Sequence, residues 1–256
     1  MLQRRTADGT VVIGQPAHAW VSGQLARSWA EPFEPWEEVC LAAEQHDIAW
    51  TGWERSPERD PETGLPYTFS ALPRLRRLEL WSGAAALLLP QSRYAALLVS
   101  LHGTLLVERF PPGGDEEVER ALEAYLERER DFQARVLDSL RGDPRYGPHS
   151  TREAVARNRE LVFAWDGLSL ALLHGVVEER TAAGHTLVPL DGDPERVAVS
   201  PWPFREDAVT VACEGRLLRE TYADERELRR GLAKAPWTTI ETRLTPALIR
   251  DSSAGD

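Results

Sequence analysis

Apolar residues recur every three or four positions through most of the first 180 residues, a spacing that predicts amphipathic helices. The polar segment over residues 51–69 is rich in Pro, Gly and charge but too aromatic for a linker, which predicts an ordered surface loop. The expected helices cover residues 18–30, 36–50, 74–89, 92–109, 115–140 and 151–178. Most of the chain is therefore expected to form a helical bundle.

After about residue 184 the pattern changes to an alternation of apolar and polar residues, which is typical of strands. The run TVVIG at 10–14 is β-branched and apolar and predicts one more short strand. The other expected strands cover residues 185–190, 196–204, 208–222 and 237–245, with a helix over 224–234. We therefore expect an α+β fold, a mainly α-helical bundle with a small antiparallel sheet from the C-terminal third plus the N-terminal strand. The chain would form a single domain over residues 1–256, with a helical core over about 15–180 and a β-rich part over about 184–248 packed on it.

The composition limits which partners the protein can bind and where in the cell it is expected. With 42% hydrophobic and 28% charged residues, the 256-residue chain has the balance of a soluble globular protein. Its formal net charge of -11, without a basic stripe, argues against duplex DNA or RNA as a partner. A small phosphorylated substrate remains compatible, because one metal ion or two arginines can neutralise it locally. The sequence has neither a signal-peptide core nor a run of roughly 20 apolar residues, so we expect a cytoplasmic protein without a membrane segment.

Four polar residues fall on the inward faces, or at the inner ends, of predicted helices. His18, His46 and Asp166 have small or apolar neighbours three, four or seven positions away. Asp47 follows His46 within the same turn, so both side chains can reach one ion near the end of their helix. An aspartate on an apolar face is costly unless it is paired or bound to a metal.

A hydrogen-bonded core position is the more frequent explanation for a single inward histidine. Four such residues on three predicted helices favour a metal site instead. Two imidazoles and two carboxylates suit a divalent transition metal and leave coordination positions open for water. The sequence therefore predicts that His18, His46, Asp47 and Asp166 bind one divalent ion.

Three segments carry a resemblance to a known superfamily. HAWVSGQLA, AAEQHDIAW and FAWDGLSLALLHG resemble the H…HD…D pattern of the HD-domain superfamily of metal-dependent phosphohydrolases, over roughly residues 15–175. A resemblance over nearly the whole chain is carried by QPAHAWVSGQLARSW, EQHDIAWTGWE, SLHG and PWPF. These segments are similar to a bacterial family of proteins of unknown function, domain of unknown function family 3891.

The HD resemblance implies an HD-like helical bundle in which His18, His46, Asp47 and Asp166 are the metal ligands. It also implies a substrate class, a small phosphorylated and nucleotide-like molecule hydrolysed by a metal-activated water. In this mechanism Asp47 orients the water in addition to binding the ion, and His102 protonates the leaving group. The ion could be Mn, Zn, Ni, Mg or Fe.

Three further residues remain open between a functional and a structural interpretation. His102 lies on an apolar helix face and could be a second-metal ligand, a proton donor, or a satisfied core histidine. Trp50 and Trp53 flank the start of the loop after His46 and Asp47, where they could line a substrate pocket or pack the loop onto the bundle.

Two alternatives to a phosphohydrolase follow from the same residues. An HD-type di-iron oxygenase would use His102 at a second iron, and a non-catalytic ligand-binding module would use the scaffold alone. Retention of all four ligand types argues against the binding module. The oligomeric state has no signal in the sequence.

Overall fold

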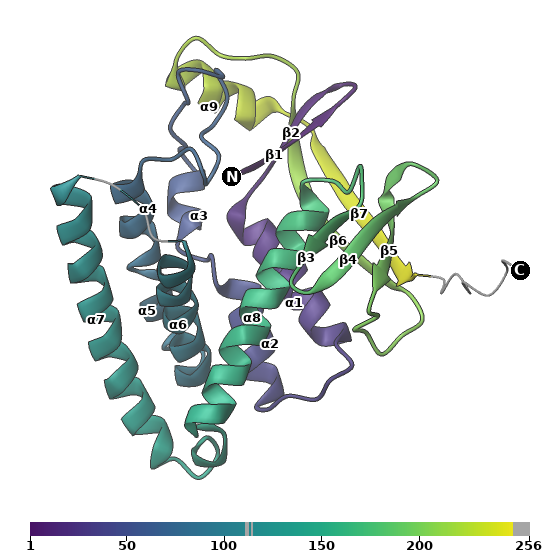
Figure 1. Ribbon diagram of the computed structural model, residues 1–256. Helices are drawn as coiled ribbons and strands as arrows, with labels where there is room; N and C mark the ends of the chain where they lie inside the picture. The colour runs from purple at the N-terminus through teal and green to yellow at the C-terminus, as the bar shows by residue number, and fades with distance from the viewer. Residues whose placement is uncertain (111–112, 114, 248–256) are drawn as a thin grey trace, which may run out of the picture.

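A seven-stranded sheet curls beside a group of helices (Figure 1). The computed structural model describes residues 1–110, 113 and 115–247. Its strands, in chain order, are β1 (Leu2–Thr6), β2 (Gly9–Ile13), β3 (Arg180–Ala182), β4 (His185–Leu190), β5 (Asp193–Ser200), β6 (Val209–Leu218) and β7 (Trp237–Pro246). The strands lie in the order β1-β2-β6-β7-β5-β4-β3, so the N-terminal hairpin forms one edge.

The expected fold class, an HD-like helical bundle with a small antiparallel sheet, is wrong. The sheet is large and mixed, since β5 pairs with β7 in parallel and every other pair in it is antiparallel. The parallel pair arises because β7 inserts between β6 and β5, a placement that no local alternation of residues can reveal. The two edge strands β1 and β3 escaped the pattern because one is mostly polar and the other is only three residues long. The strand expected at 10–14 does join the sheet, as β2.

The helices form layers that extend outward from the sheet. They are α1 (Gln15–Ser28), α2 (Trp36–Gln45), α3 (Trp50–Glu54), α4 (Arg74–Trp81), α5 (Ala84–Leu88), α6 (Arg93–Arg109), α7 (Glu116–Arg141), α8 (Arg152–Leu173) and α9 (Glu225–Lys234), with a short 3-10 turn η1 (Gly147–His149). Helix α1 contacts the sheet at β6 and also packs on α2 and α8. Helix α6 packs on α2 and α8, and α7 covers α6 from outside (Figure 1).

Three expected helices are shorter or divided. The helix expected over 36–50 ends at Gln45, and a turn separates it from α3. The helix expected over 74–89 is divided into α4 and α5 at Ser82 and Gly83. The helix expected over 151–178 ends at Leu173, because Gly175 takes a positive φ of 87° that a continuing helix does not permit. None of the helices in the described part of the chain is long and apolar enough to cross a membrane.

One hydrophobic core joins the sheet to the inner helices. Val21 and Leu25 of α1 and Trp165 of α8 are fully buried together with Ile13 of β2 and Val211 of β6. Burial of this size on each large apolar side chain contributes about 1.5–3 kcal/mol relative to exposure. The same packing fixes the faces of α1 and α8 that point toward each other.

Candidate metal centre

The four polar residues predicted to meet do so at the junction of three helices. His18 comes from α1, Asp166 from α8, and His46 and Asp47 from the C-terminal end of α2, where the chain turns toward α3. All four are buried, with between 1% and 6% of their surface exposed. The helix faces that the sequence predicts to be buried therefore carry these side chains to the same buried site.

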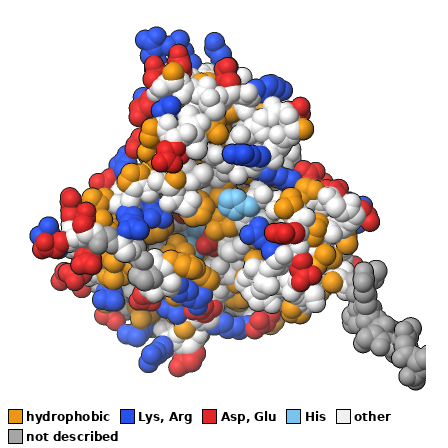
Figure 2. Space-filling model, turned by 45° about the horizontal axis from the view of Figure 1, so that its top comes forward, with side chains coloured by type: hydrophobic (Ala, Val, Ile, Leu, Met, Phe, Trp, Pro, Cys, Tyr) orange, Lys and Arg blue, Asp and Glu red, His pale blue; other side chains and the backbone are white. Residues whose placement is uncertain are grey.

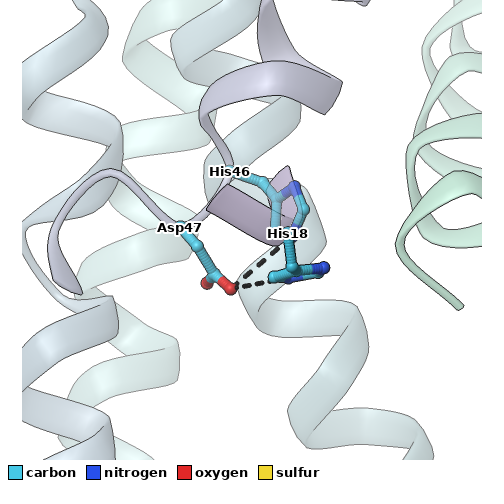
Figure 3. Close-up of side chains that lie close together, drawn as sticks. All are labelled: His18, His46 and Asp47. Carbon is cyan, nitrogen blue, oxygen red and sulfur yellow. Dashed lines mark hydrogen bonds and ion pairs between the residues drawn. The ribbon is translucent and has the colours of Figure 1, made fainter. Parts of the chain in front are cut away.

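The Nε2 atoms of His18 and His46 lie within a few ångströms of each other and of both carboxylates. His18 Nε2 is 3.0 Å from Asp47 Oδ2 and 3.2 Å from His46 Nε2. In Figure 3 the dashed lines run from the Asp47 carboxylate to the two histidines. Asp166 Oδ1 is 3.6 Å from the Nε2 atoms of both histidines, and His46 Nε2 is 3.7 Å from Asp47 Oδ2. Ligands about 2.1 Å from one ion stand about 3.0 Å apart in octahedral and about 3.4 Å apart in tetrahedral geometry. The separations here match those between ligands of a single metal ion.

Hydrogen bonds outside the cluster determine which imidazole nitrogens face inward. The Nδ1–H of His46 donates to the carbonyl oxygen of Ala43 at 2.9 Å, since a carbonyl can only accept. His18 Nδ1 lies 2.7 Å from the hydroxyl of Ser169, whose own hydrogen is donated to the carbonyl of Asp166. His18 Nδ1 must therefore be the donor in that bond. In both neutral histidines the Nε2 lone pair then points at the centre, as it does in metal-bound histidines.

The centre consequently collects electron pairs without the donors that would satisfy them. When both imidazoles are neutral, the two Nε2 lone pairs face each other and also face the carboxylates of Asp47 and Asp166. Its one described donor from outside the imidazoles is Gln15 Nε2, which donates to Asp47 Oδ2 at 3.0 Å. Such a group of buried acceptors is costly unless a cation lies among them. The residues present fit a divalent metal ion.

The pKa values of the metal-free cluster also show that a positive charge is favoured among these residues. Burial opposes the charged form of His46, but the carboxylates of Asp47 and Asp166 outweigh it and raise the pKa of His46 to about 9. Burial also opposes ionisation of Asp47 and Asp166, yet the surrounding imidazoles hold the pKa of each carboxyl below its usual range. Without a metal the cluster holds a proton in its place.

Asp47 is held in place from the start of α1. Gln15, the first residue of that helix, donates from its side chain to Asp47 and from its backbone N–H to Glu54 Oε1 at 2.6 Å. A Cβ atom at Gly14 would meet the Glu54 carboxylate, so a larger residue there would make that side chain shift. The end of β2, the start of α1 and α3 are thereby joined behind the cluster.

His102 lies next to the cluster rather than inside it. This residue of α6 has its Nε2 3.5 Å from Asp166 Oδ2, and its ring centroid is 4.8 Å from that of His46. Both of its nitrogens are buried and have no hydrogen-bond partner among the described residues. Burial, together with the charge of His46, lowers the pKa of His102 to about 4 and keeps the ring neutral. Asp166 thus faces His18 and His46 with one oxygen and His102 with the other.

The cluster forms the polar end of a cavity of about 310 Å³. Trp50 lines this cavity, whereas Trp53 does not. Both tryptophans belong to a second hydrophobic core, in which the indole N–H of Trp53 is donated to Glu58. The remaining walls are mostly apolar and come from the loop before α4 and from α4, α6 and α8. Figure 2 shows a hollow on this face of the molecule, with hydrophobic side chains around it.

Several residues of the site gave no signal in the sequence. Gln15 and Ser169 are ordinary helix residues whose role depends on the histidine or aspartate beside them. Arg74 and Arg77 of α4 line the cavity, yet the chain has 30 lysines and arginines in total and nothing local distinguishes these two. Their position follows only from the packing of α4.

Comparison with known proteins identifies the family but no activity. A family model described as "Protein of unknown function (DUF3891)" matches residues 1–220, so the chain belongs to this family. No curated protein and no solved structure matches the chain. The resemblance to the HD-domain superfamily gains no support from these comparisons.

Proposed function

We propose that this DUF3891 member is a metal-dependent hydrolase that cleaves a small phosphorylated substrate with a metal-activated water. The observation that carries the proposal is the buried pair of imidazoles of His18 and His46, whose Nε2 atoms lie between 3.0 and 3.7 Å from each other and from the carboxylates of Asp47 and Asp166. The order of these residues resembles the H…HD…D pattern of phosphohydrolases, and the substrate class rests on that resemblance.

The reaction is a hydrolysis in which water adds to phosphorus and the bond from phosphorus to the ester oxygen breaks. The leaving oxygen takes a proton, so the products are inorganic phosphate and an alcohol. A bound divalent ion would lower the pKa of the attacking water and polarise the phosphoryl oxygen. The cavity, at about 310 Å³, lies at the lower end of the approximately 300–1,000 Å³ range of ligand pockets and suits a small molecule.

The chain's own residues have separate roles in this proposal. His18 and His46 present Nε2 because Ser169 and Ala43 hold their Nδ1–H groups. Asp47, fixed by Gln15, both binds the ion and orients the attacking water. His102 has two unsatisfied nitrogens beside the cavity, where it can face the leaving group or bind a second ion.

One observation favours a second candidate function. His46, His102 and Asp166 form another group whose donor atoms lie within 4.8 Å of one another, in addition to the group of His18, His46 and Asp47. The two groups share His46, and Asp166 faces His18 and His46 with one oxygen and His102 with the other. Two adjacent ion positions would suit a di-iron oxygenase as well as a two-metal hydrolase. Metal identity separates these activities.

The test is the metal content of the purified protein, followed by activity assays on nucleotides and sugar phosphates. We expect at least one equivalent of a divalent ion and release of inorganic phosphate. His46→Ala should lose the ion and the activity while remaining folded, and His149→Gln, which alters a histidine outside the cavity, should keep both. Normal metal content in His46→Ala would refute the metal site. Two equivalents of iron with visible absorbance and no phosphate release would favour the oxygenase.

A further inference from the structure

Few charged side chains line the cavity, and they form one acidic pair and one basic pair. Apart from its histidines, the charged residues among the described lining are Asp47 and Asp166 at one end and Arg74 and Arg77 of α4. The two carboxylates belong to the candidate metal centre. The two arginines have no part in it and need a separate explanation.

Arg77 and Arg74 lack the partners that neighbouring arginines have. Within the described residues neither forms an ion pair, and Arg77 Nε is buried without a hydrogen-bond partner. Burial, and then the nearby charge of Arg74, lower the pKa of Arg77. Arg77 is half-buried and Arg74 is exposed, so the two like charges lie near each other at the cavity wall. Arg76, on the same helix, is by contrast paired with Glu58 and Glu79 and does not line the cavity.

The charge balance of the cavity indicates what the arginines bind. A divalent ion would neutralise the two aspartates, and the histidines bind metals in the neutral form. The two arginines then leave a charge of +2 on the wall of an otherwise apolar cavity. A phosphomonoester carries a charge of about −1.5 to −2 at neutral pH and offers the oxygens that guanidinium groups recognise.

We propose that Arg74 and Arg77 bind the phosphate of a phosphomonoester whose organic part is compact and apolar or aromatic. This assignment rests on the proposed hydrolase function and adds its substrate class. A phosphodiester carries one negative charge and would leave one arginine unmatched. The organic part contacts the remaining wall, whose members are apolar and come from several elements: Phe69, Leu78, Trp81, Leu106, Phe110 and Leu170.

The arginines are tested by phosphate binding, which does not require turnover. Inorganic phosphate is titrated into the metal-loaded protein by calorimetry, with Arg77→Met, Arg74→Met and the matched control Arg76→Met. Methionine keeps the apolar stem of arginine, so the variants should remain folded. We expect Arg77→Met and Arg74→Met each to weaken phosphate binding at least tenfold, the scale of a lost charged hydrogen bond, with metal content unchanged. Arg76→Met should bind phosphate like the unaltered protein.

Hydrolysis tests the substrate class with two synthetic esters. We expect the protein to cleave p-nitrophenyl phosphate in preference to bis(p-nitrophenyl) phosphate, with KM for the monoester raised at least tenfold in Arg77→Met. Equal phosphate affinity in Arg77→Met and the unaltered protein, an equal loss in Arg76→Met, or a preference for the diester would overturn the assignment.

The two proposals fail in distinguishable ways. If the protein binds inorganic phosphate through Arg74 and Arg77 but hydrolyses neither ester, the anion site stands and the hydrolase proposal fails. If the protein carries a metal and hydrolyses phosphoesters equally well without the two arginines, the hydrolase stands and the anion site fails.

Discussion

Binding of a divalent ion to the metal-free protein should release close to one proton between pH 7 and pH 8. The reason lies in the acceptor atoms of His18, His46, Asp47 and Asp166, which require a positive charge among them. In the metal-free protein a proton on His46 supplies that charge. A metal ion at the same place must displace it, because metal-bound imidazole is neutral.

The size of the effect follows from the pKa of His46. Burial lowers this pKa and the carboxylates of Asp47 and Asp166 raise it, with a net result of about 9 against an ordinary value of 6.5. At pH 7 the group is therefore almost fully protonated before the metal binds. Apparent metal affinity should rise about tenfold for each pH unit up to about pH 9, which is about 1.4 kcal/mol per unit.

The same proton makes the metal-free fold depend on pH. Because the pKa is raised on folding, its contribution is complete below pH 6.5 and is lost as the pH rises through about 9. The difference between the two pKa values corresponds to at most about 3 kcal/mol of unfolding free energy. Urea unfolding of the metal-free protein from pH 6 to pH 9.5 measures this loss.

Calorimetry in two buffers with different enthalpies of ionisation counts the released protons directly. Manganese or zinc is titrated at pH 7 and pH 8 into the unaltered protein, into His46→Gln and into the control His149→Gln. His46→Gln should bind weakly and release less than half a proton, whereas the control should behave like the unaltered protein. An affinity that is constant between pH 6.5 and pH 8.5, or binding without proton release, would refute the reasoning.

Three further substitutions test the surroundings of the centre. His102→Gln should keep the first ion but reduce turnover about 100-fold, measured as kcat on the best phosphoester. Full activity in this variant would show that His102 is only a core residue. Ser169→Ala leaves the Nδ1–H of His18 without its acceptor and should weaken metal affinity about 10- to 100-fold by calorimetry. Burial raises the pKa of Glu54 to about 7, against the lowering effect of the Met1 amine. The unfolded chain loses the Glu54 proton at a lower pH than the folded chain does. The free energy of unfolding should therefore fall, by up to about 3 kcal/mol, as the pH rises from 4.5 to 7. Glu54→Gln should abolish that fall in urea unfolding, and an unchanged pH profile would contradict the raised pKa.

The placement of the four acceptors could be predicted because the face of a helix is a local property. His18 and Asp166 each have apolar neighbours at helical spacing, and the side chains that bury those neighbours bring the polar residues along. For His46 and Asp47 the end of the helix also had to be predicted, because two adjacent residues can turn to the same side only where a helix ends. No long-range information was required for either inference.

The size of the sheet and the cavity walls could not be predicted in this way. Pairing of β5 with β7 depends on a strand that enters the sheet after the α9 crossover, and sequence alternation does not encode a neighbour. Trp53 illustrates the same limit, since it shares a hydrophobic core with Trp50, three residues earlier, yet only Trp50 of the two lines the cavity. Which of these two tryptophans faces the cavity depends on packing between distant segments of the chain.

The sheet nevertheless determines where the candidate centre lies. Strand β2 is paired on both sides, with β1 and β6, and it runs directly into α1 through Gly14. Because β2 is fixed in the sheet, Gln15 begins the helix at a set position, and its backbone N–H is held by Glu54. One turn later His18 reaches the centre, while the side chain of Gln15 holds Asp47. The seven-stranded sheet is therefore the anchor of the acceptor cluster, because the helix that contributes its first histidine starts at the end of one of the sheet's inner strands.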